Sequence, residues 1–335
     1  MRIRRFLSVF TARNREFLRD RTAMTWNIVL PVLIVMGFAF AFTTESPDLF
    51  KVGLIGEQPT QDRAEFLQTR HIQFISMDNL ESSIVKIERH QLDMLMEPRT
   101  GHYWINDTSS RGYILEQLLK GQENAGEIKR QTVTGDEIRY VDWLIPGILS
   151  MNIMFSSLFG VGYTIVRYRK NGVLKRLKAT PLTALEFLSA QIFSRLWLIA
   201  LISIMVYAGT DLFVNFRMYG SHLNLLLVLI LGTFCMISLS LVVAARMSNE
   251  EAANGLLNLM SWPMMLLSGV WFSLEGSPAL VQQLSQLLPL THVIDAARSV
   301  MIDGAGLAQI SHHLGILILM SGLFLFIGAR MFKWD

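Results

Sequence analysis

The chain has 335 residues, of which 51% are hydrophobic and only 17% are charged, below the roughly 25% that is usual for soluble domains. The net charge is +3, and the single cysteine, Cys235, excludes a disulfide framework within the chain. This composition excludes an ordinary soluble domain, and the shortage of charge is concentrated in long apolar stretches.

Six stretches of about twenty residues, enough for an α-helix to cross roughly 30 Å of hydrocarbon, contain one charged side chain between them, Arg195. They comprise residues 22–44, 143–166, 187–210, 221–245, 252–274 and 311–329. We predict an α-helical polytopic membrane protein with six transmembrane helices, the last extended to residue 332. Arg195 lies about two turns from the end of its helix, near enough for its side chain to reach the membrane surface.

The segment before the first span, residues 1–21, has the spacing of an amphipathic helix. Its apolar residues are Ile3, Phe6, Leu7, Phe10, Phe17 and Leu18. Arginines occupy the other face, so we predict a cytoplasmic helix in the membrane surface, with its arginines toward anionic headgroups. The alternative is a solvated leader with accidental periodicity. The apolar run that follows is too long for a signal peptide, and we expect the first span to be retained.

Residues 45–142 differ from the apolar stretches in composition and in the pattern of their hydrophobic residues. Short strands are predicted at 51–56, 72–76 and 103–107, and helical spacing occurs at 61–70 and 79–96. Strands that alternate with helices predict a small α/β domain between the first two spans. The histidines of this segment stand singly and predict no metal site; they are His71, His90 and His102.

The loop 167–186 between the second and third spans is short and strongly basic. Its cations are Arg167, Arg169, Lys170, Lys175, Arg176 and Lys178. Leu174 and Leu177 are three residues apart, and Pro181 ends the short helix that they predict. An amphipathic helix held between two spans is suited to docking in a groove on a cytosolic partner. A basic loop that only reinforces membrane topology is the alternative.

The segment 275–310 is too polar to span a membrane and too apolar for an ordinary loop. Pro278 and Pro289 divide it into two short helices. We predict extracytoplasmic re-entrant or interfacial helices, whose free backbone groups must be covered by protein. Asp295 and Arg298 are three residues apart and can pair on one helix face, either as a structural pair or as a gate that contacts substrate.

Lysine and arginine crowd the segments before the first span, between the second and third spans, and after the last span. This distribution predicts that both termini are cytoplasmic and that 45–142 and 275–310 lie outside. Because the basic clusters adjoin membrane ends, we expect no nucleic-acid partner.

Motifs for enzymatic chemistry are absent from the sequence. It contains no G-x-x-x-x-G-K-[ST], no H-E-x-x-H, no G-x-S-x-G and no cluster of carboxylates within a span. Ion-coupled transporters keep ionisable groups at bilayer depth, where only Arg195 lies here. We therefore predict no catalytic residue, no metal site and no cofactor on this chain, and we expect any energy source to be another chain.

Two motifs resemble those of type-2 ABC exporter membrane subunits, the ABC transporter permeases. The loop R-Y-R-K-N-G-V-L-K-R-L-K-A-T-P-L-T-A-L-E-F is similar to their cytoplasmic loop, which reads G-T-L-E-R-L, then P-x-[ST] and a Glu. The matching residues are Gly172, Leu174, Arg176, Leu177, Pro181, Leu182, Thr183 and Glu186. A second segment, 266–301, resembles a family element through Ser268, Gly269, Phe272, Pro278, Pro289, Leu290, Thr291, Asp295, Ala296 and Arg298. Val173 and Lys175 depart from the usual Thr and Glu, and the resemblance covers essentially the whole chain.

The resemblance implies an exporter subunit of the bacterial inner membrane, surrounded by lipid. Its six spans would form half of a translocation pathway, and a second permease chain, identical or a paralogue, would supply the rest. A separate ATPase subunit would bind ATP and Mg²⁺ and drive the spans through a coupling helix, with residues 1–21 as a connecting helix. The implied coupling residues are Gly172, Val173, Leu174, Lys175, Arg176, Leu177 and Pro181.

A mixed aromatic, methionine and amide lining of the pathway is expected on the first, second and fifth spans, because such surfaces accept varied amphiphiles. The candidates are Met24, Asn27, Asn152, Phe155, Phe159, Asn254, Asn258 and Met265. The alternative is that these residues only pack helix against helix. A membrane sensor or receptor with a ligand-binding outer domain is the alternative function, and the sequence leaves the transported substrate open.

Overall fold

The computed structural model describes residues 2–41, 50–56, 66, 69, 71–77, 79–90, 92–121, 129–135, 138–274 and 278–334. The chain divides into two compact units, a helical unit of Met1–Ala41 and Val141–Asp335, and an inserted unit of Phe42–Tyr140.

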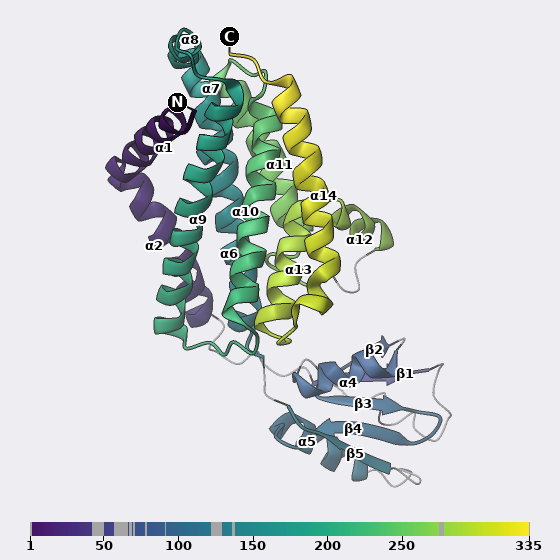
Figure 1. The fold of residues 1–335 in the computed structure, drawn as a ribbon. Helices are drawn as coiled ribbons and strands as arrows, with labels where there is room; N and C mark the ends of the chain where they lie inside the picture. Colours follow the sequence, from purple (N-terminus) through teal and green to yellow (C-terminus); the bar gives the residue numbers. More distant parts are fainter. Residues whose placement is uncertain are drawn as a thin grey trace. The chain divides into compact units, whose positions relative to one another are not determined.

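The helical unit is built from long helices and a few short ones (Figure 1). They are α1 Arg2–Arg19, α2 Arg21–Ala41, α6 Tyr140–Ser157, the π-helix η2 Leu158–Tyr163, α7 Thr164–Lys170, α8 Val173–Lys178, α9 Ala184–Val214, α10 His222–Ala244, α11 Glu250–Leu267, α12 Ala279–Gln286, α13 Pro289–Met301 and α14 Leu307–Met331. α6, η2 and α7 follow one another without a break, so the second predicted span is one continuous helical rod.

Four helices of the described chain are long and apolar enough to cross a membrane, namely Tyr140–Lys170, Ala184–Val214, His222–Ala244 and Leu307–Met331. They correspond to the second, third, fourth and sixth predicted spans, and a polytopic helical membrane protein is confirmed to that extent. The first predicted span contains a shorter apolar stretch, Asn27–Phe38, and its end at 42–44 lies outside the described residues.

The fifth predicted span, 252–274, is wrong in its last seven residues, 268–274. α11 ends at Leu267, because Ser268 leaves the helical conformation and Gly269 adopts a positive φ of 70°. Only glycine enters that region at little steric cost. The apolar residues after Gly269 therefore form a turn, which contributes to the cavity described below.

α10 lies at the centre of the helical unit and contacts α9, α11, α13, α14 and η2. Small residues allow these close approaches: a Cβ built on Gly232 falls 2.7 Å from a Val293 side-chain carbon, and one on Gly328 falls 3.1 Å from the Leu241 Cβ. Membrane helices associate mainly through such van der Waals contact, because lipid tails are as apolar as leucine. The sequence of α10 is therefore apolar all round and most of it is buried.

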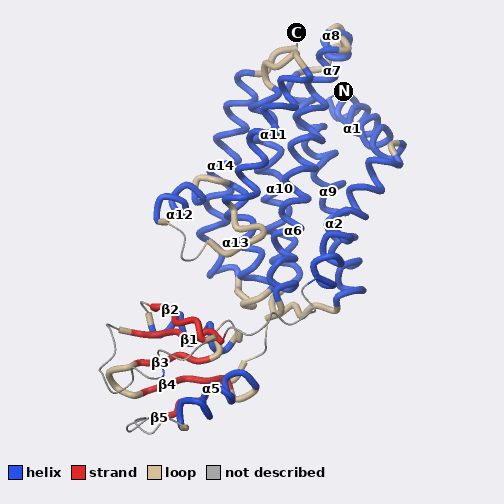
Figure 2. The backbone as a smooth tube through the Cα atoms, turned by 180° about the vertical axis from the view of Figure 1, so that it is seen from behind, coloured by secondary structure: helices blue, strands red, loops and turns tan. Residues whose placement is uncertain are grey.

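The inserted unit is an α/β fold with a five-stranded sheet in the order β2-β1-β3-β4-β5 (Figure 2). Its elements are β1 Phe50–Ile55, β2 Ile72–Met77, α4 Leu80–Glu88, β3 Met94–Glu97, β4 His102–Asn106, α5 Ser110–Lys120 and β5 Lys129–Val133. Among the described strands, only the β3–β4 pairing is antiparallel, and the other pairings are parallel. Alternate residues of the central strands enter two separate apolar clusters, so the sheet is covered on both faces.

The α/β fold of this insertion agrees with the prediction, and the three predicted strands are present. The predicted helix over 79–96 is wrong beyond Glu88, because Met94, Leu95 and Met96 form a fully buried central strand. A short apolar run of this kind reads as either helix or strand in the sequence. β5 and α5 were not predicted, and of the helix expected at 61–70 only Phe66 and Thr69 are described.

Candidate functional site

α8 forms the short helix that the basic loop predicts. Gly172 precedes it with a positive φ of 68°, which lets the chain turn sharply out of α7. Leu174 is 0% exposed and lies in an apolar cluster with Ile165, Phe187 and Leu241, which come from α7, α9 and α10. α8 is therefore anchored to the helices of its own chain by the buried Leu174 side chain.

The remaining coupling candidates have different surroundings. Lys175, Arg176 and Pro181 are exposed, while Val173 and Leu177 are half-buried. Leu177 also contacts the apolar cluster around Leu174. The outward face of α8 is thus mainly cationic, with Leu174 pointing the other way.

Thr183 and Glu186 start α9 with a reciprocal capping box. The Thr183 Oγ1 accepts from the Glu186 N–H at 3.2 Å, and the Glu186 Oε2 accepts from the Thr183 N–H at 2.9 Å. This arrangement satisfies two backbone donors that a helix start leaves without partners. Both residues belong to the motif that suggested the family resemblance, and their role in this structure is to position α9 after the α8 loop.

Arg169, counted in the sequence as one more cation of the basic loop, is almost fully buried. Its Nη1 donates to the Ala244 carbonyl at 2.8 Å, and its Nη2 donates to the carbonyls of Ala245 at 3.0 Å and Lys333 at 2.7 Å. The carbonyls at a helix C-terminus lack intrahelical donors and carry partial negative charge. Arg169 thereby joins α7 to the end of α10 and to the C-terminal tail, where the Trp334 ring lies 5.6 Å from that of Phe187.

A second buried arginine attaches α1 to the π-helix η2. Arg13 is 4% exposed, and its Nη2 donates to the Gly160 carbonyl at 2.8 Å and to the Thr164 Oγ1 at 3.0 Å. The Nε of Arg195 donates to the same Gly160 carbonyl at 3.0 Å. A π-turn breaks the regular i to i−4 ladder, and Gly160 lies within that turn and accepts from both guanidinium groups.

Glu16 balances this concentration of positive charge. Its carboxylate accepts from the Arg13 Nη1 at 2.8 Å and from the Arg167 Nη2 at 2.9 Å, and Tyr168 donates its hydroxyl to the same group. Burial alone raises the pKa of Glu16, but the Tyr168 hydrogen bond and the two arginines outweigh it and hold the pKa below its ordinary value. Glu16 therefore stays ionised near neutral pH.

Two expectations about these arginines are wrong. Arg195 does not extend to a surface: its Nε is bound to Gly160 and its Cζ lies 4.6 Å from the centre of the Phe17 ring. Arg13 does not face outward on α1 but lies against the rest of the chain, and Phe17 is buried beside it. Ile3 and Leu7 are exposed, so only part of the apolar face of α1 remains open.

The pathway candidates on α2 and α6 hold those two helices together. The Asn152 Nδ2 donates to the Asn27 carbonyl at 3.0 Å, and the Ser156 Oγ donates to the Asn27 Oδ1 at 2.7 Å. Phe155 and Phe159 stack with ring centres 6.0 Å apart and are half-buried. These contacts agree with the packing alternative and leave the pathway role a prediction.

The candidates on α11 differ from one another in exposure. Asn254 is exposed, and its carbonyl accepts from the Asn258 Nδ2 at 2.8 Å, whereas Met265 is buried. Met24 of α2 is half-buried. The Asn254–Asn258 pair gives one face of α11 a polar strip beside large exposed side chains such as Trp262.

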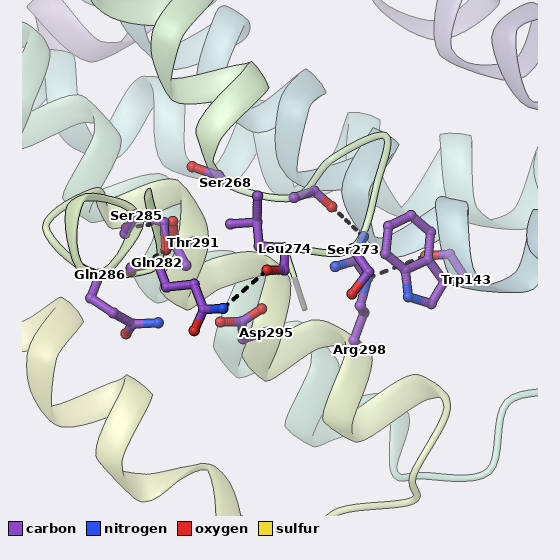
Figure 3. Close-up of a pocket in the computed structure, with 11 residues that line it drawn as sticks. Trp143, Ser268, Ser273, Leu274, Gln282, Ser285, Gln286, Thr291, Asp295 and Arg298 are labelled. Atoms are coloured by element: carbon purple, nitrogen blue, oxygen red, sulfur yellow. Dashed lines mark hydrogen bonds between the residues drawn. The ribbon is translucent and has the colours of Figure 1, made fainter. Parts of the chain in front are cut away.

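Asp295 and Arg298 line a cavity of about 380 Å³ between the turn after α11 and the helices α12 and α13 (Figure 3). The Arg298 Nη2 donates to the Gly269 carbonyl at 2.6 Å, its Nε donates to the Trp143 carbonyl at 3.3 Å, and its Cζ lies 3.6 Å from the Trp143 ring centre. Arg298 thus fixes the turn after α11 to the start of α6, while Asp295 lies on the same helix and faces the cavity. Among the described residues, no group of three or more His, Cys, Asp or Glu side chains could hold a metal ion.

Comparison with known proteins gives a family match over nearly the whole chain. The family described as ABC-2 family transporter protein matches residues 22–330. A probable multidrug ABC transporter permease, YbhS of Escherichia coli K12, is 20% identical over 98% of this chain and 96% of its own length. Nodulation protein J of Sinorhizobium fredii is 27% identical over 59% of this chain and 75% of its own, and the inner membrane transport permease YhhJ of Escherichia coli K12 is 24% identical over 54% and 49%.

Proposed function

The chain belongs to the ABC-2 family of transporter proteins, and from that premise we propose that it is the membrane permease subunit of an ATP-driven exporter. In this proposal the chain forms half of a translocation pathway, and a separate ATPase subunit supplies the work. The observation that carries the proposal is the construction of α8, whose Leu174 is buried in the chain's own core while Lys175 and Arg176 face outward.

The anchoring of α8 suits a helix that transmits movement. Leu174 contacts a cluster to which α7, α9, α10 and α11 all contribute, through residues such as Phe187 and Ala253. A force on the exposed face of α8 therefore reaches four helices through close-packed side chains, which transmit displacement because protein interiors compress little. Binding of a partner that prefers one arrangement of these helices shifts their populations.

α1 lies at the same end of the helical unit as α8. The N-terminus, the C-terminus and α8 lie together at one end of the helical unit, and α2 runs from there toward the other end (Figure 1). Arg5 donates to the Pro181 carbonyl, which brings α1 to the loop that follows α8. This supports a single face made of α1, α8 and the C-terminal tail (Figure 1), which is cytoplasmic in our proposal. The distribution of lysine and arginine along the chain is the basis for proposing that the inserted α/β unit lies outside an inner membrane.

The surface of α11 supports a second permease chain. Leu259 is 70% exposed and Trp262 is 55% exposed, and the Asn254–Asn258 pair lies on the same helix. Exposed amides on a membrane helix are costly against lipid and are favourable against protein or a water-filled pathway. We propose that α11 faces a second copy or a paralogue across the pathway. The comparisons do not favour a membrane sensor or receptor.

The test is purification of the full chain from a mild detergent, identification of the ATPase that co-purifies, and measurement of ATP hydrolysis by the complex. Arg176→Glu with Lys175→Glu is expected to abolish co-purification, because it reverses the charge of the docking face while Leu174 stays in place. Lys129→Glu, an exposed charge reversal on the inserted unit, is the matched control and keeps wild-type behaviour. An ATPase that binds the double variant as well as it binds the wild type contradicts the proposal, as does a wild type that recruits none.

A further inference from the structure

The cavity that contains Asp295 and Arg298 has the size and polarity of a ligand site. Its volume of about 380 Å³ is roughly ten times that of one water molecule and falls in the range of small-molecule pockets. It is lined by Trp143, Ser268, Gly269, Ser273, Leu274, Gln282, Ser285, Gln286, Thr291, Asp295 and Arg298. Such a lining of hydroxyl, amide and carboxylate groups is unusual beside membrane helices, where polar groups are costly unless they have partners.

Three hydrogen-bond donors in this lining already have acceptors within the chain, those of Thr291, Ser285 and Gln282. The Thr291 hydroxyl donates to the Ser285 carbonyl at 2.7 Å, and the Ser285 hydroxyl donates to the Gln282 carbonyl at 2.7 Å. The Gln282 Nε2 donates to the Leu274 carbonyl at 3.4 Å (Figure 3). A hydroxyl has one proton and two lone pairs, so Thr291 and Ser285 can offer only acceptor capacity to a molecule in the cavity.

Two polar groups in the lining, the Ser268 hydroxyl and the Asp295 carboxylate, form no hydrogen bond with another described residue. The Ser268 Oγ is buried, its residue is 1% exposed, and among the described residues it has no hydrogen-bond partner. The Asp295 carboxylate likewise accepts none of the hydrogen bonds formed between described residues. A buried polar group without a partner costs about 1–3 kcal/mol, which a bound molecule can recover.

The Arg298 guanidinium does not supply the missing partner for Asp295 or Ser268, because its hydrogen bonds go to other groups. Its guanidinium lies against the Trp143 ring and donates to the Gly269 and Trp143 carbonyls, at one side of the cavity. Figure 3 shows the Asp295 carboxylate directed toward the Gln282 side and the Arg298 side chain at the Trp143 side. The Gln282 side of the cavity is therefore negative and rich in acceptors.

We propose that this cavity binds a primary or secondary ammonium group, held by the Asp295 carboxylate and by the oxygens of Ser268, Ser285 and Thr291. An ammonium carries two or three N–H donors and a positive charge, which match the spare acceptors and the carboxylate. The ligand class is a small molecule or headgroup with such a group, either a transported amine or an aminophospholipid. The inference rests on the geometry of this cavity and does not require the ATPase or the second chain.

Calorimetric titration of the full chain in phosphatidylcholine nanodiscs at pH 7.5 tests the site. The probe is 2-phenylethylammonium, and its neutral analogue 2-phenylethanol has nearly the same size and apolar part. The ammonium is expected to bind at least about tenfold more tightly than the alcohol, since a single charge-assisted hydrogen bond contributes roughly 1.5–3 kcal/mol. Equal binding of the two probes, or no binding of the ammonium at millimolar concentration, overturns the proposal.

Asp295→Asn is the decisive variant, because it keeps the shape and removes the charge. It is expected to weaken ammonium binding about tenfold or more and to leave the alcohol unaffected. Asp211→Asn, an exposed carboxylate on α9, is the matched control and binds as wild type. Ser268→Ala is the second variant, with an expected loss of about three- to tenfold, and a folded Asp295→Asn chain that binds the ammonium at wild-type affinity overturns the proposal.

The source of the ammonium group is distinguished by the lipid. Replacing half of the phosphatidylcholine by phosphatidylethanolamine lowers the apparent affinity of the probe if the lipid headgroup occupies the cavity. An unchanged affinity assigns the site to a soluble or transported amine. Since no ATPase is present in these titrations, their failure is separate from a failure of the proposed function.

Discussion

Replacement of Arg13 by methionine tests whether the contact between α1 and the π-helix holds the N-terminal helix in place. Methionine keeps the length and apolar volume of the arginine stem but removes its charge and all its donors. In the native structure these donors reach the Gly160 carbonyl, the Thr164 hydroxyl and the Glu16 carboxylate. The variant leaves Thr164 without this donor and leaves Glu16 with Arg167 and Tyr168.

The size of the effect follows from burial. Glu16 has a side chain that is 38% exposed, so the ion pair itself contributes only about 0.5–1 kcal/mol after solvent screening. The bonds from the Arg13 guanidinium to Gly160 and Thr164 are buried and charge-assisted, at about 1.5–3 kcal/mol each. Arg13→Met is therefore expected to destabilise the helical unit by roughly 3–5 kcal/mol, and Glu16→Gln by about 1 kcal/mol.

Thermal unfolding in one detergent at one scan rate, followed by tryptophan fluorescence, measures which of the two variants is destabilised more. At roughly 2–4 °C per kcal/mol for a chain of this size, Arg13→Met lowers the apparent midpoint by about 6 °C or more and Glu16→Gln by a few degrees. Arg15→Met, an exposed arginine on the same helix, is the control and leaves the midpoint within about one degree. The reasoning is refuted if Glu16→Gln is as damaging as Arg13→Met, because the ion pair and not the carbonyl bonds would then hold α1.

Acid provides an independent check of the same contact. The pKa of Glu16 is depressed in the folded protein, so its contribution to stability is present above the ordinary value of 4.5 and is lost as pH falls through the lower folded pKa. Between pH 7 and pH 5 the contact is expected to be unchanged, and α1 is expected to loosen only below about pH 4.5. Glu16→Gln removes this acid step, as measured by protease cleavage of α1 across the same pH range.

Three further predictions follow from the burial of particular groups. Leu174→Ala removes a fully buried side chain and is expected to destabilise the chain by about 2–5 kcal/mol in thermal unfolding, whereas Arg176→Ala changes stability by less than about 0.5 kcal/mol and lowers only ATPase recruitment. Gly232→Val places a branched side chain where a Cβ already falls 2.7 Å from Val293, and is expected to cost about 1–3 kcal/mol or more, while Gly255→Val, with nothing within 4 Å, leaves helix packing unchanged. Burial raises the pKa of Asp295 to about 6, partly offset by Arg298, and among the described lining residues only these two are charged. Binding of 2-phenylethylammonium is therefore expected to weaken about tenfold per pH unit below pH 6 in calorimetric titrations, and to be independent of pH in Asp295→Asn.

The parts of this fold that the sequence predicts are those with a strong local signal. Long charge-free runs correctly predicted four long helices, and the basic loop with Leu174 and Pro181 correctly predicted the short helix α8. Strand–helix alternation gave the α/β unit. In each case the periodicity or a breaking residue acts within a few positions along the chain, so no tertiary contact is needed to recognise it.

The parts that the sequence misses depend on contacts between distant residues. The stretch 158–163 is charge-free and reads as ordinary helix, so nothing local indicates the π-turn except the two glycines, Gly160 and Gly162. That Gly160 offers its carbonyl to Arg13 and Arg195 is visible only once α1 and α9 are in place. The helix predicted over the segment that forms β3 was wrong for a related reason, since the burial of this segment on both sides depends on residues distant in the sequence.

The arginines of α1, α7 and α8 show how this limits a prediction based on charge alone. A count of positive residues treats Arg13, Arg169 and Arg176 alike, yet two are buried on backbone carbonyls and only Arg176 is exposed. A buried guanidinium on a carbonyl at a π-turn or a helix end adds less attraction for an acidic partner or an anionic lipid surface than an exposed one, because its donors are bound and the carbonyl dipoles offset part of its charge. The electrostatic face that a partner meets is therefore narrower than the sequence indicates, and charge reversal at Arg13 or Arg169 is expected to act through stability, whereas reversal at Arg176 acts through binding.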